Sequence, residues 1–149
     1  MPSTYSNLLF HVVFSVKERM KLLSKDLRER LFPYISGIAN KNDFKTLTVG
    51  GTDDHIHILL SLKPETNVSK AVQLIKGGSS KWIHDNFSNL NIFSWQEGYG
   101  AFTVSISQID VVKNYIANQE EHHKKMNFEE EYLELLKRNN IDFDPKYLF

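Results

Sequence analysis

Two histidines separated by a single residue stand in a short apolar run, His55-Ile56-His57-Ile58-Leu59-Leu60. Such a run is typical of a β-strand, in which neighbouring side chains point to opposite faces of the sheet. His55 and His57 would then share one face, and the all-apolar face would lie on the core. Neutral imidazoles are good ligands for borderline divalent metal ions. Two ligands do not make a site, so the pair indicates either part of a metal centre or two polar residues on a half-exposed strand.

A second candidate lies in a helical segment near the C-terminus. Tyr115 and Gln119 are four residues apart and therefore share a helix face, and His122 follows on roughly the same face. A phenol with an ordinary pKa of about 10 is a poor nucleophile unless something activates it. A divalent metal that polarises a target phosphate reduces that need. By itself the spacing is more typical of an ordinary helix surface.

Hydrophobic periodicity, together with capping and turn residues, predicts the helices and strands that must position these side chains. Ser24 and Asn67 are expected to cap the first two helices, and Gly50-Gly51 to end a strand that forms a hairpin with the histidine strand. The expected strands are 5–16, 44–51, 55–62 and 102–106, and the expected helices are 24–38, 67–83, 107–123 and 128–139, with a long loop over 86–101.

The resulting order, β-α-β-β-α-β-α, predicts an α+β fold of the ferredoxin-like or RRM-like type, a split β-α-β with a mostly antiparallel sheet. Two helices would cover one face, leaving the other for a ligand or a further helix. A C-terminal tyrosine-bearing helix and an acidic tail complete the chain. Gly77-Gly78 lies inside the second helix pattern and predicts either a break or a close approach to the helix backbone.

Composition narrows the classes of protein. A chain of 149 residues is most simply one domain, and the absence of Cys excludes a disulfide scaffold and a cysteine nucleophile. Neither a signal peptide nor a run of 18 apolar residues is found, so we expect a cytoplasmic protein without a membrane partner. Residues 1–119 carry 13 Lys and Arg against 10 Asp and Glu, whereas residues 120–149 carry 5 against 8. The mildly basic body is compatible with a phosphate backbone.

Together the two candidate motifs resemble one family, the single-tyrosine HUH transposases, which include small insertion-sequence and REP-associated tyrosine transposases. His55-Ile56-His57 is similar to the family's HUH strand, and Tyr115 with Gln119 is similar to its Tyr-x-x-x-Gln helix. Four further segments match in order along the chain: 11–19, 76–81, 95–99 and 119–123.

This resemblance implies an enzyme that cleaves and rejoins single-stranded DNA at hairpin-bearing element ends. Tyr115 would be the nucleophile and would form a covalent 5′-phosphotyrosine. His55, His57 and Gln119 would hold Mg²⁺ or Mn²⁺, which would bind weakly because no carboxylate joins it unless Asp53 or Asp54 approaches. The alternatives are a non-catalytic single-strand-binding module derived from such an enzyme, and a metal-dependent hydrolase of small substrates.

The resemblance also implies partners. The family works as a homodimer in which the tyrosine helix of one subunit completes the histidine site of the other, and the segment Val104-Ser105-Ile106 is a candidate edge for joining two sheets. Alternative roles as core or surface residues stay open for all the DNA contacts. The expected phosphate contacts are Lys17, Arg19, Lys76, Ser79 and Lys81, and the expected base-stacking residues are Trp95 and Tyr99.

The tail lies beyond the family's minimal core. We therefore expect a transposase domain over residues 1–126 and a C-terminal helical extension over 127–149, packed on or near that domain. Its helix is acidic, with Glu129, Glu130, Glu131 and Glu134. The extension could pack on the body or screen the DNA groove, and the sequence leaves both open.

Overall fold

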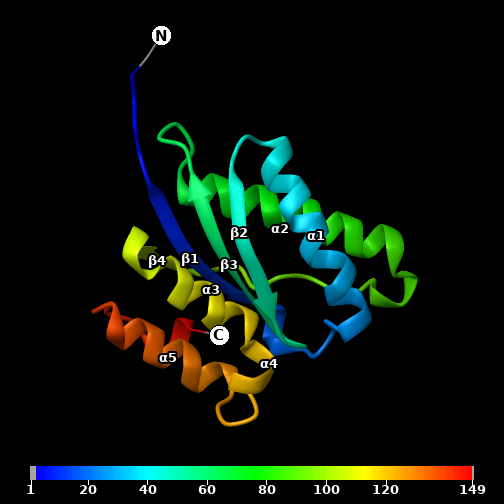
Figure 1. Cartoon of the computed structure of the whole chain (residues 1–149). Coiled ribbons are helices and arrows are strands. Elements are labelled where there is room, and N and C mark those ends of the chain that lie inside the picture. Colours follow the sequence, from blue (N-terminus) through cyan, green and yellow to red (C-terminus); the bar gives the residue numbers. More distant parts are fainter. Residues whose placement is uncertain (1–2, 149) are drawn as a thin grey trace.

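The computed structural model describes residues 3–148. Its strands form one four-stranded antiparallel sheet (Figure 1). Its strands are β1 (Leu8–Ser15), β2 (Lys45–Gly51), β3 (His55–Leu62) and β4 (Gly100–Val104), in the order β2-β3-β1-β4. Each neighbouring pair is antiparallel. The two central strands, β1 and β3, are separated in sequence by a helix and by β2. This is the predicted split β-α-β arrangement, so the predicted fold class is confirmed.

Helices cover both faces of the sheet (Figure 1). α1 (Lys25–Lys41) and α2 (Val68–Asn86) lie on one face. On the opposite face lie α3 (Ile109–Ala117), α4 (Gln119–His122) and α5 (Phe128–Arg138). Short 3₁₀ turns occur at Lys17–Arg19, Ser88–Leu90, Ile106–Gln108 and Pro145–Tyr147. None of the helices in residues 3–148 is long and apolar enough to cross a bilayer.

The main hydrophobic core lies between the sheet and the pair α1/α2. The alternate residues Ile56, Ile58 and Leu60 of β3 are fully buried in it. They meet the apolar faces of both helices, including Leu31 and Ile35 of α1 and Ile75 of α2. The apolar face predicted for the histidine strand is thereby confirmed. Because β3 alternates strictly, the histidines must point to the other side.

The predicted helix starts are confirmed by capping contacts. Ser24 Oγ accepts from the Leu27 N–H at 3.2 Å, and Asn67 Oδ1 accepts from the Lys70 N–H at 2.7 Å. α2 continues through Gly77-Gly78 without a break. A Cβ on Gly78 would lie 2.8 Å from the Cδ1 atom of Ile38 in α1, so the glycine permits the close approach of the two helices.

A second, smaller apolar cluster docks α5 on the opposite face of the sheet. Val13 of β1 and Phe102 of β4 contact the apolar side of α5. That side is formed by Phe128, Tyr132, Leu135 and Leu136. The acidic extension therefore packs on the body through α5 and covers the histidine face of the sheet. Screening of a DNA groove by the extension stays a prediction.

Several predicted boundaries differ from the structure: β1 begins at Leu8 rather than at residue 5, and α1 and α2 each end three residues later than expected. β4 spans 100–104 rather than 102–106 because a 3₁₀ turn begins at Ile106. The helix predicted over 107–123 is interrupted at Asn118, between α3 and α4. The Asn118 side-chain N–H and backbone N–H both donate to the Asn114 carbonyl oxygen, at 2.8 and 3.1 Å. Asparagine competes in this way with regular helix hydrogen bonding.

Candidate metal and nucleophile site

The histidine pair is buried under the C-terminal helices. His55 and His57 point to the α3–α5 side of β3 and have no exposed surface. α3 reaches this side because β2 carries Gly50, where a Cβ would lie 2.2 Å from the Ile116 carbonyl oxygen. Close backbone contact therefore brings the neighbouring Tyr115 to the histidines. The ring centroids of His57 and Tyr115 are 5.8 Å apart.

The three residues expected to hold a metal lie together. Gln119 is 1% exposed, and its Oε1 is 3.1 Å from His55 Nε2. The rings of His55 and His57 are 5.1 Å apart in an edge arrangement. The break at Asn118 leaves Gln119 next to Tyr115, whose carbonyl accepts a weak bond from the Gln119 amide at 3.4 Å. All four side chains of the two sequence motifs therefore meet within one chain.

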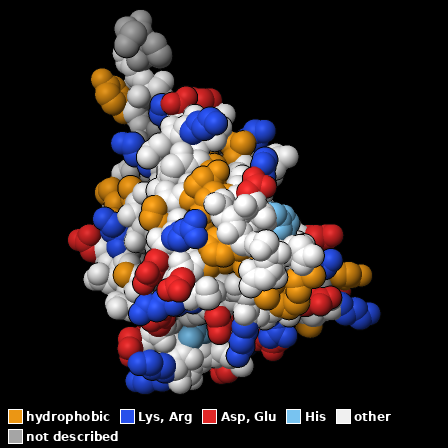
Figure 2. Space-filling view, turned by 90° about the vertical axis from the view of Figure 1, so that its right-hand side faces the viewer, with side chains coloured by type: hydrophobic (Ala, Val, Ile, Leu, Met, Phe, Trp, Pro, Cys, Tyr) orange, Lys and Arg blue, Asp and Glu red, His pale blue; other side chains and the backbone are white. Residues whose placement is uncertain are grey.

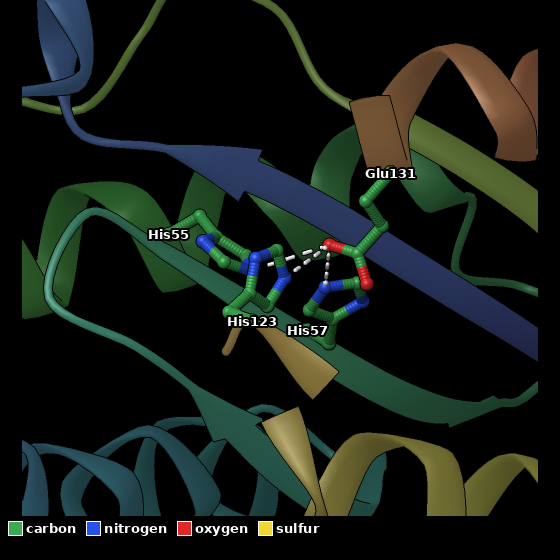
Figure 3. Close-up of side chains that lie close together, drawn as sticks. All are labelled: His55, His57, His123 and Glu131. Carbon is green, nitrogen blue, oxygen red and sulfur yellow. Dashed lines mark hydrogen bonds and ion pairs between the residues drawn. The ribbon is translucent and has the colours of Figure 1, made fainter. Parts of the chain in front are cut away.

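Two residues that the sequence reasoning missed join them, His123 and Glu131 (Figure 3). The Glu131 carboxylate is 1% exposed, and its Oε1 is 3.0 Å from His57 Nε2, 3.4 Å from His55 Nε2 and 2.9 Å from His123 Nε2. Among the described residues, ligand atoms of His55, His57, His123 and Glu131 all lie within 4.8 Å of one another. Three imidazole nitrogens and one carboxylate oxygen thus converge on one small region, and this donor set fits a divalent cation.

Further polar groups orient the two strand histidines. Asp54 Oδ1 is 2.7 Å from His55 Nδ1, and His11 Nε2 is 2.8 Å from His57 Nδ1. In a metal-bound form each Nδ1–H would donate outward, and both Nε2 atoms would face the shared region with a free lone pair. Metal-ligating histidines are held by this kind of outer hydrogen bond. Asp54 therefore supports His55 from behind rather than approaching as a ligand.

Burial and charge give the histidines different proton affinities. Burial lowers the pKa of His57 to about 4, and that of His11 to about 3. Burial also disfavours the charged form of His55, but hydrogen bonds to Asp54 and Glu131 outweigh it and raise its pKa to about 9. Against the cost of its own burial, bonds from the three histidines hold the pKa of Glu131 well below its usual range. Without a metal, His55 is therefore the cation that balances the buried carboxylate.

The phenol of Tyr115 is half-buried and donates a hydrogen bond to Glu131 Oε2. Burial, followed by the charge of Glu131, raises its pKa above the usual value. The phenol therefore stays protonated at neutral pH and is a weak nucleophile without further activation. Its other side is open: it lines a surface hollow of about 590 Å³ together with His122, Asn118 and Lys125.

A second hollow, of about 380 Å³, opens beside His123 on the histidine side of the cluster. It is lined by His123 and Asp54 and by the cations Lys21, Arg28 and Lys124. The two hollows flank the cluster, one at Tyr115 and one at the histidines.

The structure buries two of the predicted DNA contacts. Trp95 is 7% exposed and donates from Nε1 to Ser79 Oγ at 3.0 Å, and Ser79 is itself fully buried. The Trp95 ring packs edge-on against Phe14 and Phe93. These contacts argue against base stacking by Trp95 and phosphate binding by Ser79. Both positions face the α1/α2 core, where an aromatic ring and a small hydroxyl fill space.

Several predicted basic contacts are engaged within the protein. Lys76 Nζ donates to the carbonyls of Gln96 and Gly98 at 2.7 Å each and lies over the Phe14 ring, so it orders the loop before β4. Lys81 pairs with Asp85 at 2.7 Å, on the surface.

The remaining predicted contacts lie nearer the surface. Arg19 pairs with Glu129 of α5 at 2.5 Å. Lys17 is exposed and Tyr99 is half-buried. Figure 2 shows basic and acidic side chains interspersed on one side of the molecule, with no continuous basic surface there.

One sequence signal could have revealed Glu131. On the helix 128–138 it falls on the same side as Phe128, Tyr132 and Leu135, which is otherwise apolar, while Glu129, Glu130 and Glu134 lie toward solvent. A lone carboxylate on an apolar helix face must be compensated when that face is buried. His123 carries no comparable local signal, because its position depends on the turn after α4.

Comparisons with known proteins identify the family of the chain and support its fold. The family described as IS200-like transposases matches residues 4–119, and the chain therefore belongs to that family. The chain is 27% identical over 119 residues to the ISDra2 transposase TnpA of Deinococcus radiodurans, covering 75% of this chain and 84% of the relative. It is 28% identical over 123 residues to the transposase for insertion sequence element IS200 of Salmonella typhimurium, covering 79% and 80%.

Two solved structures share the fold. A Deinococcus radiodurans R1 protein described as a transposase superposes with a TM-score of 0.67 at 23% identity, over 80% of this chain and 95% of that one. A REP-associated tyrosine transposase bound to a REP hairpin superposes with a TM-score of 0.57 at 15% identity, over 78% of this chain and 68% of that one. The family of the chain, which was predicted from the HUH and tyrosine motifs, is confirmed.

Proposed function

We propose that this IS200-like transposase cleaves and rejoins single-stranded DNA through a covalent bond between Tyr115 and a 5′-phosphate. The observation that carries the proposal is the meeting of Tyr115, His55, His57 and Gln119 in one buried cluster that opens to two hollows. A binding module that only grips DNA has no use for a tyrosine aimed at a histidine pair. The coarser assignment, a transposase acting on DNA, rests on the family.

In the proposed reaction the phenolic oxygen of Tyr115 attacks the scissile phosphorus. The new Tyr–O–P bond forms as the P–O3′ bond breaks, the phenol loses its proton, and the departing 3′ oxygen takes one up. A second 3′-hydroxyl reverses the step on the same phosphorus, so the bond energy is conserved and no nucleotide cofactor is consumed. Mg²⁺ or Mn²⁺ held by His55, His57 and Gln119 would polarise a phosphate oxygen. Gln119 and the two histidines would thereby position the phosphate for attack by Tyr115.

The DNA is proposed to enter along the two hollows that flank the cluster. Lys21, Arg28 and Lys124 line the hollow on the histidine side, and Lys125 lines the hollow at Tyr115. Of the contacts predicted from sequence, Lys17, Arg19, Lys81 and Tyr99 are retained as proposals. The neighbouring REP-associated enzyme is bound to a hairpin, which supports a hairpin-bearing substrate for this chain.

Assembly is proposed to be homodimeric, as the resemblance implies. β4 is an edge strand, so its outer side is available for pairing. Within one chain, however, Tyr115 lies beside its own histidines, so a shared site requires α3 to cross to the partner. Equal amounts of Tyr115→Phe and His57→Ala protein should be mixed after subunit exchange has been shown. Recovered cleavage supports shared sites, and exchange without recovery establishes a site within one chain.

The nucleophile is tested by incubating the protein with single-stranded element ends and Mn²⁺ and resolving the products under denaturing conditions. Tyr115→Phe should lose the covalent adduct and strand cleavage while still binding the hairpin. Tyr34→Phe is the matched control, because Tyr34 is exposed on α1 and stacks on Trp82, on the other side of the sheet. A full adduct yield from Tyr115→Phe would refute the proposal.

The same assay separates the alternative functions. Hairpin binding by the wild-type protein without cleavage or adduct would identify a derived binding module. Cleavage by water without an adduct would identify a metal-dependent hydrolase. The division into a domain over 1–126 and an extension over 127–149 stays a prediction.

A further inference from the structure

We propose that Glu131 is a ligand of the divalent metal. Its Oε1 atom would bind the metal together with His55, His57 and His123, while its Oε2 atom holds the phenol of Tyr115. This inference rests on the proposed function for the presence of a metal. It adds two residues from the C-terminal segment to the ligand set, and it gives one carboxylate the task of fixing the nucleophile relative to the metal.

The spacing of the donor atoms supports coordination. Ligand atoms bound at about 2.1 Å to one cation lie about 3.0 Å apart along an octahedral edge and about 3.4 Å apart along a tetrahedral edge. Glu131 Oε1 lies 2.9, 3.0 and 3.4 Å from the Nε2 atoms of His123, His57 and His55. Gln119 Oε1 lies 3.1 Å from His55 Nε2. Each of these four separations therefore matches that of neighbouring ligands around one ion, and the ligand atoms of His55, His57, His123 and Glu131 all lie within 4.8 Å of one another.

The position of Glu131 is fixed by the helix that carries it. Asn127 and Glu130 form a capping box that sets the first residue of α5. Phe128 stacks on His55 with ring centroids 4.4 Å apart, and Tyr132 packs in the cluster over Val13 and Phe102. Glu131 lies between these two aromatic residues on the docked side of α5. Its carboxylate therefore reaches the histidines from a rigid element, as a preorganised ligand requires.

The same carboxylate connects the metal region to the nucleophile. Oε1 faces the histidines, whereas Oε2 accepts hydrogen bonds from the Tyr115 phenol and from the Gln119 amide, the latter at 3.2 Å. Loss of the carboxylate should therefore weaken metal binding and also release Tyr115. The undocking of α5 would have both effects at once.

The extended set also bears on the identity of the metal. Mg²⁺ prefers oxygen ligands and retains several waters, whereas imidazole suits the transition metals. Three imidazoles with one carboxylate and one amide therefore favour Mn²⁺ over Mg²⁺. The carboxylate also removes the reason for expecting weak binding, which was the absence of a charged protein ligand.

The test is a calorimetric titration of the full-length, DNA-free protein with Mn²⁺. Glu131→Gln keeps the size of the side chain and removes its charge. Loss of a residue that only orients a metal ligand weakens metal binding by about 10–100-fold. Loss of Glu131, as a ligand itself, should weaken Mn²⁺ binding by at least as much. Glu134→Gln is the matched control, because Glu134 lies one turn further along α5 and pairs with the exposed Arg138. It should bind Mn²⁺ as wild type does, and Tyr115→Phe should bind it comparably.

A spectroscopic readout covers the case in which Glu131→Gln disturbs the fold. Co²⁺ absorption in the visible reports the number and type of ligands, and Glu131→Asp should retain a carboxylate-bound spectrum where Glu131→Gln does not. Unchanged Mn²⁺ affinity and Co²⁺ spectra in Glu131→Gln would overturn the proposal. If the adduct yield also rose, Glu131 would instead be a residue that inhibits the reaction of Tyr115. If His57→Ala also binds Mn²⁺ as wild type does, the metal centre of the proposed function fails as well.

Discussion

The α1/α2 face of the sheet and the α3–α5 face bury side chains of opposite character. The first buries aliphatic and aromatic groups such as Ile58, Leu60 and Ile75, which contact one another without directional bonds. The second buries His55, His57 and Glu131 in a hydrogen-bonded network with only a small apolar cluster beside it. A single strand, β3, supplies both sides through its alternation. The first face thus stabilises the fold and the second concentrates polar groups at a cost in desolvation.

Removing the metal ligands should have the largest effect, and only on the polar face. EDTA should stop adduct formation by the wild-type protein, and Mn²⁺ should restore it. His57→Ala should lose cleavage, and added Mn²⁺ should not restore it because a ligand is gone. Denaturing gels of protein–DNA adducts measure this. Undiminished adduct formation in excess EDTA would remove the metal from the mechanism.

Truncation on the apolar face should instead reduce stability. Ile75→Ala removes a fully buried side chain of α2 and should lower the free energy of unfolding by about 2–5 kcal/mol. Mn²⁺ affinity, measured where the variant is still folded, should not change, because the residue lies across the sheet from the histidines. A loss of Mn²⁺ affinity comparable to that of His57→Ala would contradict the separation of the two faces.

A methyl group added at Gly50 should disturb the α3–α5 face of the sheet by displacing the backbone of α3. In Gly50→Ala the new Cβ would meet the Ile116 carbonyl oxygen, so α3 must move away from β2. Overpacking of this kind costs about 1–3 kcal/mol. We expect adduct yield to fall as well, since Tyr115 precedes Ile116 in α3. Normal adduct yield with reduced stability would show that the position of α3 is not critical.

The pH dependence of stability in the metal-free protein should arise from the histidine face. Buried His11 and His57 have pKa values lowered to about 3 and about 4, so below pH 6.5 the unfolded chain takes up protons that the folded chain does not. Stability should therefore fall as the pH drops from 7 to 5. Burial of His55 favours its neutral form, but bonds to Asp54 and Glu131 outweigh this and raise its pKa to about 9. The stability that protonated His55 contributes to the folded state is therefore lost as the pH rises through 9.

Urea unfolding in EDTA between pH 5 and 10 should accordingly show a maximum near neutrality. His11→Gln, which cannot take up a proton, should reduce the acid slope. A stability that is constant between pH 7 and 5 would contradict the neutral state assigned to the two buried imidazoles.

The smallest expected effect lies on the outer face of α2. Gly77 is exposed, and a Cβ there would meet nothing within 4 Å. Gly77→Ala should stabilise the protein by about 0.5–1 kcal/mol through helix propensity. Adduct yield should be unchanged. Thermal unfolding and the adduct assay together compare this glycine with Gly50, where the same methyl group is expected to be harmful.

The sequence predicted the features that depend on local patterns. Strand alternation placed His55 and His57 on one face, and polar residues before apolar periods located the caps Ser24 and Asn67. It did not predict that Glu131 and His123 join the histidines, because that depends on where α5 docks after a turn. The sequence around Trp95 is equally compatible with a stacking and a core residue, and the long-range packing against Phe14 favours the core. The roles assigned to Tyr115 and to the ligands stay predictions.

The most direct test of the account is to identify the residue that carries DNA after the wild-type protein has reacted with a single-stranded element end and Mn²⁺. Proteolysis and mass spectrometry of the adduct should find a 5′-phosphate-linked nucleotide on Tyr115, and the linkage should be absent in EDTA. Linkage to another residue such as Tyr99, or cleavage with no linked peptide, would contradict the account.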